Sequence, residues 1–149
     1  MATLLDTSIL GRLANRADAS HAVAQAAVAE LHRRGEVLHI TPQNLVEFRN
    51  FATRPISANG LGLTAFAAEG LALTFEGAFQ LLEESPAIFP AWKALVQGLA
   101  VVGKQVHDAR IVAVCHVYAV KQILTFNIAH ISQMSTFGPG VVVVHPATV

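Results

Sequence analysis

The chain has 149 residues, a length that predicts a single domain over residues 1–149. Its hydrophobic fraction of 53% excludes intrinsic disorder, which requires low hydrophobicity and a high net charge. Ten basic and ten acidic side chains cancel to a net charge of zero, so no overall basic field draws the protein to nucleic acid or to a membrane. Any such partner has to be bound by a local cluster of side chains.

The sequence carries no sign of export or of a membrane span. The N-terminus lacks the basic segment and long apolar segment of a secretory signal, and no apolar stretch reaches the roughly 18 residues of a membrane helix. The single cysteine, Cys115, excludes a disulfide within the chain and lies in an apolar stretch. These features predict a cytoplasmic protein with no membrane partner.

Short apolar runs alternate with segments of helical periodicity, which predicts an α/β fold with an open, mainly parallel sheet flanked by helices. In the first half we expect a strand at Ala2–Leu5, a helix at Thr7–Ala14, a helix from Ser20 to Arg33, a strand at Val37–Ile40, and a helix that begins at Thr41-Pro42 and ends before Pro55.

The second half continues the alternation after a turn-rich loop at Pro55–Leu63. Glycines at positions 70 and 77 disfavour a helix in the segment that follows this loop. We expect a helix from Ala65 capped by Thr64, a break at Glu83–Pro86, helices at Pro90–Val101 and His107–Val120, a strand at Gln122–Phe126, a turn at Gly138–Gly140 and a last strand at Val141–Val144.

Polar side chains fall where predicted strands end and predicted helices begin. Asp6 follows the first strand and Asn127 follows the strand Gln122–Phe126. Glu47 and Asp108 lie in the early parts of helices, and helices of a right-handed βα arrangement begin at the same edge of the sheet. Ligands bind at this edge in open parallel sheets. The four side chains are therefore predicted to converge there.

Carboxylate and amide oxygens without sulfur or imidazole form a hard site that suits Mg²⁺ or Mn²⁺. Such an ion lowers the pKa of a bound water and neutralises charge on a phosphate, so hydrolysis of a phosphodiester needs no protein nucleophile. The same acids also have structural interpretations: Asp6 and Asp108 as helix N-caps, and Glu47 as the partner of an arginine. The arginines available for that pairing are Arg49, Arg54 and Arg110.

Two other enzyme classes are disfavoured. A phosphatase with Asp6 as its nucleophile needs a second aspartate two residues later, where Ser8 stands. The seven histidines show no metal-binding spacing of the HxH or HExxH kind.

Four segments of the chain resemble, in order and spacing, the four motifs of PIN-domain ribonucleases of the VapC toxin type. These segments are Leu4–Leu10, Asn44–Phe48, Val106–Ala113 and Ile123–Asn127, and the loop Arg54–Leu63 is also similar to that family. The resemblance implies a PIN-like parallel sheet flanked by helices and a Mg²⁺- or Mn²⁺-dependent endoribonuclease. It further implies a homodimer and inhibition by a small antitoxin protein, which inserts a C-terminal segment near the acidic site.

The resemblance also implies roles for individual residues. Asp6, Glu47 and Asp108 correspond to metal ligands and, together with Asn127, to the catalytic set. Thr7 and Thr125 are expected to support these ligands by hydrogen bonds. Cations must offset the repulsion between the carboxylates and an RNA substrate. Those expected to contact RNA are Arg49, Arg54 and Arg110.

The fourth motif departs from the family pattern. Family members often carry an Asp-Phe pair three residues after the asparagine or aspartate, and this chain has His130 and Ile131 there. Loss of that carboxylate weakens a second metal position. It supports an alternative hypothesis, in which the chain is a PIN-like binding module with lost or weak nuclease activity.

Overall fold

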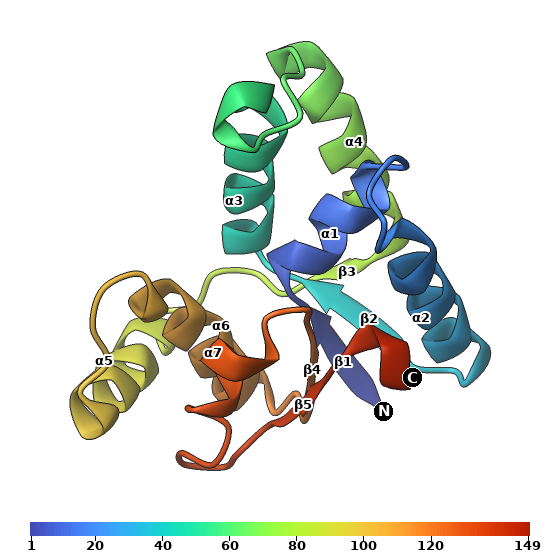
Figure 1. The fold of residues 1–149 in the computed structure, drawn as a ribbon. Helices are drawn as coiled ribbons and strands as arrows, with labels where there is room; N and C mark the ends of the chain where they lie inside the picture. The colour runs from blue at the N-terminus through green and yellow to red at the C-terminus, as the bar shows by residue number, and fades with distance from the viewer.

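The computed structural model describes all 149 residues as a three-layer α/β arrangement (Figure 1). Five parallel strands form one sheet in the order β3-β2-β1-β4-β5. The strands are β1 (Ala2–Leu5), β2 (Val37–Ile40), β3 (Gln80–Leu81), β4 (Gln122–Leu124) and β5 (Val142–Val144). The helices are α1 (Thr7–Ala14), α2 (His21–Arg33), α3 (Pro42–Thr53), α4 (Ala65–Ala78), α5 (Ile88–Leu99), α6 (Gln105–Tyr118) and α7 (Ile128–Ser132). None of these helices combines the length and the apolar character that crossing a bilayer requires.

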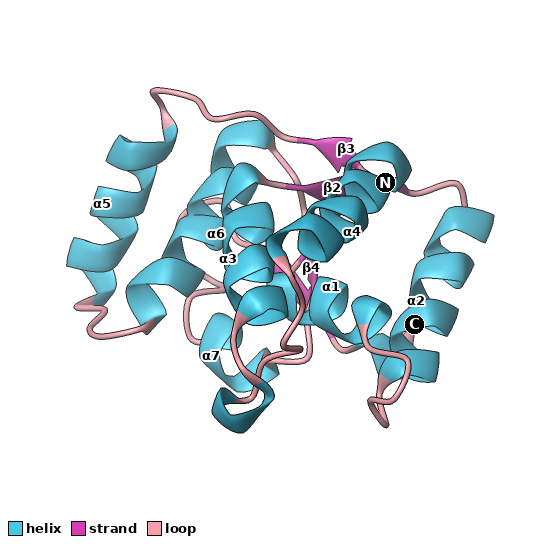
Figure 2. Cartoon of the chain, turned by 90° about the horizontal axis from the view of Figure 1, so that it is seen from above, coloured by secondary structure: helices cyan, strands magenta, loops and turns pink.

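Helices cover both faces of the sheet, as the view in Figure 2 also shows. Successive side chains of a strand point to opposite faces. In β1, Leu4 therefore packs into a core shared with α5, α6 and α7, whereas Leu5 packs into a second core shared with α1, α2, α3 and α4. Ile123 and Leu124 of β4 divide between the two cores in the same way. The near-continuous apolar character of the central strands follows from this burial on both sides.

The central strand β1 marks the point where strand order reverses. It pairs with β2 on one side and with β4 on the other, with Leu5 opposite Leu124. Because all strands are parallel, their carboxyl ends lie at one edge, and a crevice forms where connections leave in opposite directions. Asp6 follows β1 directly and stands at this crevice.

Several predicted elements are confirmed, including Ala2–Leu5, Thr7–Ala14 and Val37–Ile40. The helix expected from Pro90 begins instead at Ile88, since a proline is tolerated in the first helical turn, where its missing N–H has no partner in the helix. The strand expected to reach Phe126 ends at Leu124, because the Phe126 N–H donates to the Ser8 hydroxyl instead of to a strand.

The other boundaries differ more modestly. The helix expected at His107–Val120 spans Gln105–Tyr118, and the last strand begins at Val142 rather than Val141. The helix α4 continues through both of its glycines to Ala78. Two short elements were not predicted, the two-residue strand β3 and the five-residue helix α7. Neither is long enough to show a periodic pattern in the sequence.

Candidate active site

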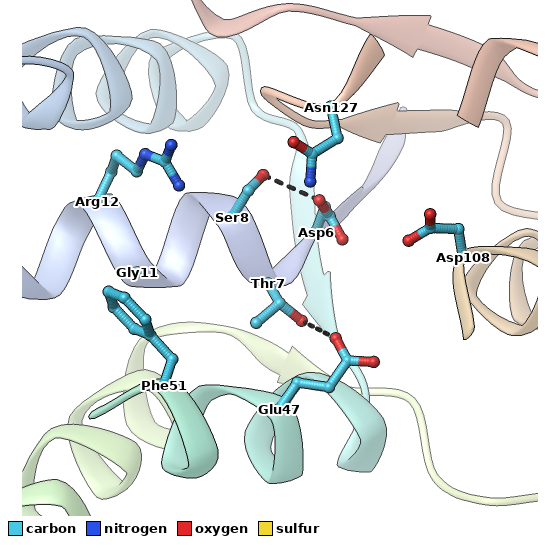
Figure 3. Close-up of a pocket in the computed structure, with 9 residues that line it drawn as sticks. All are labelled: Asp6, Thr7, Ser8, Gly11, Arg12, Glu47, Phe51, Asp108 and Asn127. Atoms are coloured by element: carbon cyan, nitrogen blue, oxygen red, sulfur yellow. Dashed lines mark hydrogen bonds between the residues drawn. The ribbon is translucent and has the colours of Figure 1, made fainter. Parts of the chain in front are cut away.

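A cleft of about 210 Å³ opens at the carboxyl edge of the sheet (Figure 3). It contains all four predicted catalytic residues, which come from four different segments of the chain. The residues that line it are Asp6, Thr7, Ser8, Gly11, Arg12, Glu47, Phe51, Asp108 and Asn127. The predicted convergence of the three carboxylates and the amide on one edge is thus present in the fold.

Asp6 is held in place by two hydroxyl groups. It is buried, and its Oδ2 accepts hydrogen bonds from Ser8 at 2.9 Å and from Thr125 at 2.7 Å. The Thr125 hydroxyl also accepts the backbone N–H of Asn127 at 2.9 Å, so one threonine links two residues of the cleft. Asp6 occupies the N-cap position of α1, but its side chain makes no capping hydrogen bond, so capping does not account for its carboxylate.

Replacement of Thr125 by valine is expected to lower the free energy of unfolding by about 1–3 kcal/mol. Thr125 is fully buried, so valine keeps its shape but leaves the Asp6 carboxylate and the Asn127 N–H each short of a partner. Urea denaturation of Thr125→Val and of Thr125→Ser measures the difference. A Thr125→Val variant as stable as the wild type would show that the hydroxyl contributes nothing.

Glu47 is positioned by α3, whose first turn is closed by a capping box between Thr41 and Asn44. The Asn44 amide donates to the Thr7 hydroxyl at 3.0 Å, and that hydroxyl donates to Glu47 Oε2 at 2.7 Å. This hydrogen bond to Glu47 is consistent with the predicted supporting role of Thr7. Glu47 forms no ion pair with an arginine, so that alternative interpretation is wrong.

Gln43 joins the two helices that carry Glu47 and Asp108. Its amide donates to Glu47 Oε1 at 2.7 Å and to the carbonyl of His107 in α6 at 2.9 Å. The Arg110 guanidinium in turn donates to the Gln43 amide oxygen at 3.3 Å. Gln43 is not among the residues predicted from the sequence, although its spacing of four residues from Glu47 places both side chains on one face of a helix.

Asp108 approaches Asp6 from the opposite side of the cleft, as Figure 3 shows. It is the fourth residue of α6 and does not cap it, because Lys104 occupies the N-cap position. Burial, followed by the negative charge of Asp6, raises the pKa of Asp108 to about 6, and Glu47 adds to this rise while His130 opposes it. Close carboxylates raise one another's pKa in this way, and a bound cation relieves the repulsion.

The raised pKa of Asp108 makes the stability of the metal-free protein depend on pH. The ionised carboxylate destabilises the folded state, so its penalty is absent below the ordinary pKa of 3.8 and fully developed above about 6. We expect Asp108→Asn to gain stability relative to the wild type as pH rises through this interval, measured by urea denaturation in EDTA. A stability difference that stays constant with pH would contradict this cause.

The arginines predicted to contact RNA lie outside the cleft. Arg49 forms an ion pair with Glu69, and Arg110 pairs with Glu84 at 2.6 Å. Arg54 stands over the ring of Phe51 and donates to a loop carbonyl. The one cation that does line the cleft is Arg12, which is not among the residues predicted from the sequence. Its spacing of four residues from Ser8 in α1 was the available signal.

The donor set fits a hard divalent cation, since it consists of three carboxylates and one amide. After burial, the negative charges of Asp6 and Glu47 contribute to the raised pKa of Asp108, so the three carboxylates repel one another. No group of three His, Cys, Asp or Glu side chains, however, lies close enough as it stands to hold one ion. Rotation of the side chains is therefore needed to bring the carboxylates onto a shared metal.

The fourth motif places its two unusual residues in different surroundings. Ile131 of α7 is fully buried in the core that contains α5 and α6. His130 is largely exposed, and its Nδ1 lies 3.9 Å from Asp108 Oδ2. An imidazole thus stands beside a cleft carboxylate at the position where the family pattern has a carboxylate.

Comparison with solved structures finds the same fold in several proteins. VapBC2 from Rickettsia felis, solved with a DNA fragment of its promoter, gives a TM-score of 0.73 at 14% identity, with 97% of this chain and 98% of that chain covered. FitAcB from Neisseria gonorrhoeae gives a TM-score of 0.69 at 13% identity, with 99% of each chain covered. VapC20 of Mycobacterium tuberculosis, a toxin that cleaves the sarcin–ricin loop, gives a TM-score of 0.62 at 20% identity, with 87% of this chain and 93% of that chain covered.

No curated protein sequence matches the chain at a significant level. The family model for the PIN domain matches residues 3–134, which include every residue that lines the cleft. The five-stranded parallel sheet and its flanking helices agree with that match. The chain therefore belongs to the PIN domain family.

Proposed function

We propose that the protein is a metal-dependent endoribonuclease, the toxin of a toxin–antitoxin pair, which hydrolyses RNA phosphodiester bonds. The observation that carries this proposal is the meeting of Asp6, Glu47, Asp108 and Asn127 on one cleft at the switch point of the sheet. Membership of the PIN domain family and the shared fold with the VapC20 toxin support it.

In this proposal Asp6, Glu47 and Asp108 bind one Mg²⁺ or Mn²⁺ ion, which activates a water molecule and neutralises charge on the phosphate. Hydrogen bonds from Thr125 to Asp6 and from Thr7 to Glu47 hold both carboxylates at the cleft, and a shared ion would require the side chains to turn toward it. Asn127 is exposed on the rim of the cleft, where its amide can orient the water or the phosphate.

The chemical test is cleavage of structured RNA by the purified protein with Mn²⁺, with Mg²⁺ and with EDTA. We expect internal cleavage with at least one of the two ions and none in EDTA. Cleavage that continues unchanged in EDTA would contradict the metal mechanism, and no cleavage with either ion would contradict the nuclease.

We also propose two protein partners, a small antitoxin and a second copy of the chain. Helices α3, α4 and α5 carry the large apolar side chains of Val46, Phe66 and Phe89 exposed to solvent, and partners would cover such side chains. VapBC2 and FitAcB, which share the fold, support the antitoxin part of the proposal. Light scattering after size-exclusion chromatography is expected to give the mass of a dimer, and a monomer mass would contradict the homodimer.

The second candidate is a PIN-like binding module with lost or weak nuclease activity, and His130 beside Asp108 favours it. The variant His130→Asp separates the two candidates, because it adds the carboxylate of the family pattern. If the wild type binds RNA without cutting it and the His130→Asp variant does cut it, the protein is the binding module. Cleavage by the wild type supports the enzyme.

A further inference from the structure

Arg12 is the only basic side chain among the nine residues that line the acidic cleft. It projects from α1 one turn beyond Ser8, and in Figure 3 its guanidinium lies on the same side of that helix as Asn127. Asp108 stands at the other end of the cleft. The cleft therefore has an acidic end and a basic end.

The hydrogen-bonding capacity of the Arg12 guanidinium is unused. None of its nitrogens donates a hydrogen bond within the protein, and its Nε is buried without a partner. The nearest carboxylate is Asp18, whose Oδ2 lies 3.9 Å from Nε in a solvent-accessible pair, and such pairs contribute little. A buried donor without a partner is costly, and a ligand that accepts from this guanidinium removes part of that cost.

The guanidinium is nevertheless held in position. Its central carbon lies 5.1 Å from the centroid of the Phe126 ring, a cation–π arrangement. The rings of Phe126 and His145 meet at nearly a right angle, with their centroids 5.2 Å apart. The Phe126 N–H donates to the Ser8 hydroxyl, which itself donates to Asp6. A short chain of contacts thus fixes the Arg12–Phe126 pair relative to the carboxylate that follows β1.

We infer that Arg12 binds a phosphate group of the RNA strand next to the bond that is cut, at the Asn127 end of the cleft. This inference rests on the proposed function. A strand laid across the cleft brings its phosphates close to three carboxylates, so it needs a cation within the cleft to offset the repulsion. The planar fork of a guanidinium matches two oxygens of a phosphate.

The experiment measures RNA binding apart from cleavage. A short, fluorescently labelled single-stranded RNA is titrated in EDTA at several salt concentrations, with the wild type, Arg12→Gln, Arg12→Lys and Arg16→Gln. The last variant is the matched control: Arg16 is exposed, lies four residues from Arg12 and does not line the cleft, and its replacement removes the same charge.

Loss of one phosphate contact is expected to reduce the slope of log K against log salt concentration by about 0.7 in Arg12→Gln. The affinity at low salt should fall about tenfold, as expected for one charge-assisted hydrogen-bonded contact. Arg12→Lys should keep the slope but bind more weakly than the wild type, because it keeps the charge and loses the fork. Arg16→Gln should bind as the wild type does. Thermal unfolding checks that each variant is folded. If Arg12→Gln does not fold, the comparison of Arg12→Lys with the wild type tests the inference.

Three results would overturn the inference: no RNA binding by the wild type, unchanged affinity and slope in Arg12→Gln, or an equal loss in Arg16→Gln. Unchanged RNA affinity in Arg12→Gln would instead indicate that this side chain binds a carboxylate of a protein partner. RNA binding that depends on Arg12 in a protein that cuts no RNA would retain the inference and contradict the proposed function.

Discussion

Replacement of Asp6 by asparagine is expected to lower metal-dependent RNA cleavage by more than about 100-fold. Loss of a hydrogen-bonded partner of a metal ligand alone costs 10–100-fold, and Asp6 is itself a proposed ligand. The amide keeps an oxygen that can accept from Ser8 and Thr125, so the fold around the cleft should persist. The measurement is the initial rate of cleavage of one RNA at saturating Mn²⁺.

The matched control for this substitution is Glu76→Gln, which also replaces a carboxylate by its amide. Glu76 is exposed on α4 and does not line the cleft, so its variant is expected to cut RNA at the wild-type rate. Thermal unfolding of both variants separates loss of activity from loss of structure. Folded Asp6→Asn that cuts RNA as fast as Glu76→Gln would contradict the role of Asp6.

Truncation of Phe48 to alanine is expected to lower the free energy of unfolding by about 3–5 kcal/mol. Phe48 is fully buried in the core of α1 to α4, and its ring meets that of Phe75 edge to face at 5.0 Å. Alanine loses this aromatic contact and leaves a cavity between α3 and α4. The loss is large compared with the total stability of an ordinary domain.

The Phe48→Ala variant should also lose cleavage activity, because Phe48 anchors the helix that carries Glu47 and Gln43. Asn50→Ala in the same helix is the control, since Asn50 is exposed and its truncation should change stability by less than about 0.5 kcal/mol. Urea denaturation monitored by circular dichroism measures both variants. A cost below about 1 kcal/mol for Phe48→Ala would show that α3 is not anchored by this side chain.

The sequence predicted the acidic side of the cleft because its signal is local. Asp6 directly follows a strand of apolar residues, and in a parallel sheet the end of a strand alone determines the edge to which the next residue belongs. Glu47 follows β2 by way of a helix that begins at Thr41-Pro42, a start that the sequence also shows. These two junctions bring Asp6 and Glu47 to one edge of the sheet, whereas Asp108 lies in α6, which follows α5 and not a strand.

The support and the basic side of the cleft could not be predicted, because they depend on contacts between distant segments. The hydrogen bond from Thr125 to Asp6 spans 119 residues, and Gln43 reaches a carbonyl 64 residues away. The sequence places Asp6 at the start of a helix but does not show that its Oδ2 accepts from hydroxyl groups instead of capping the helix. The ion pairs of Arg49 with Glu69 and of Arg110 with Glu84 are contacts of the same long-range kind.

The most direct test of the account is whether the carboxylates of the cleft bind a divalent cation. Calorimetric titration of Mn²⁺ into the wild type, Asp108→Asn and Glu76→Gln provides it, since only Asp108→Asn removes a carboxylate of the cleft. We predict binding to the wild type and to Glu76→Gln, and its loss in Asp108→Asn. Equal binding by all three proteins, or none by the wild type, would contradict the metal site.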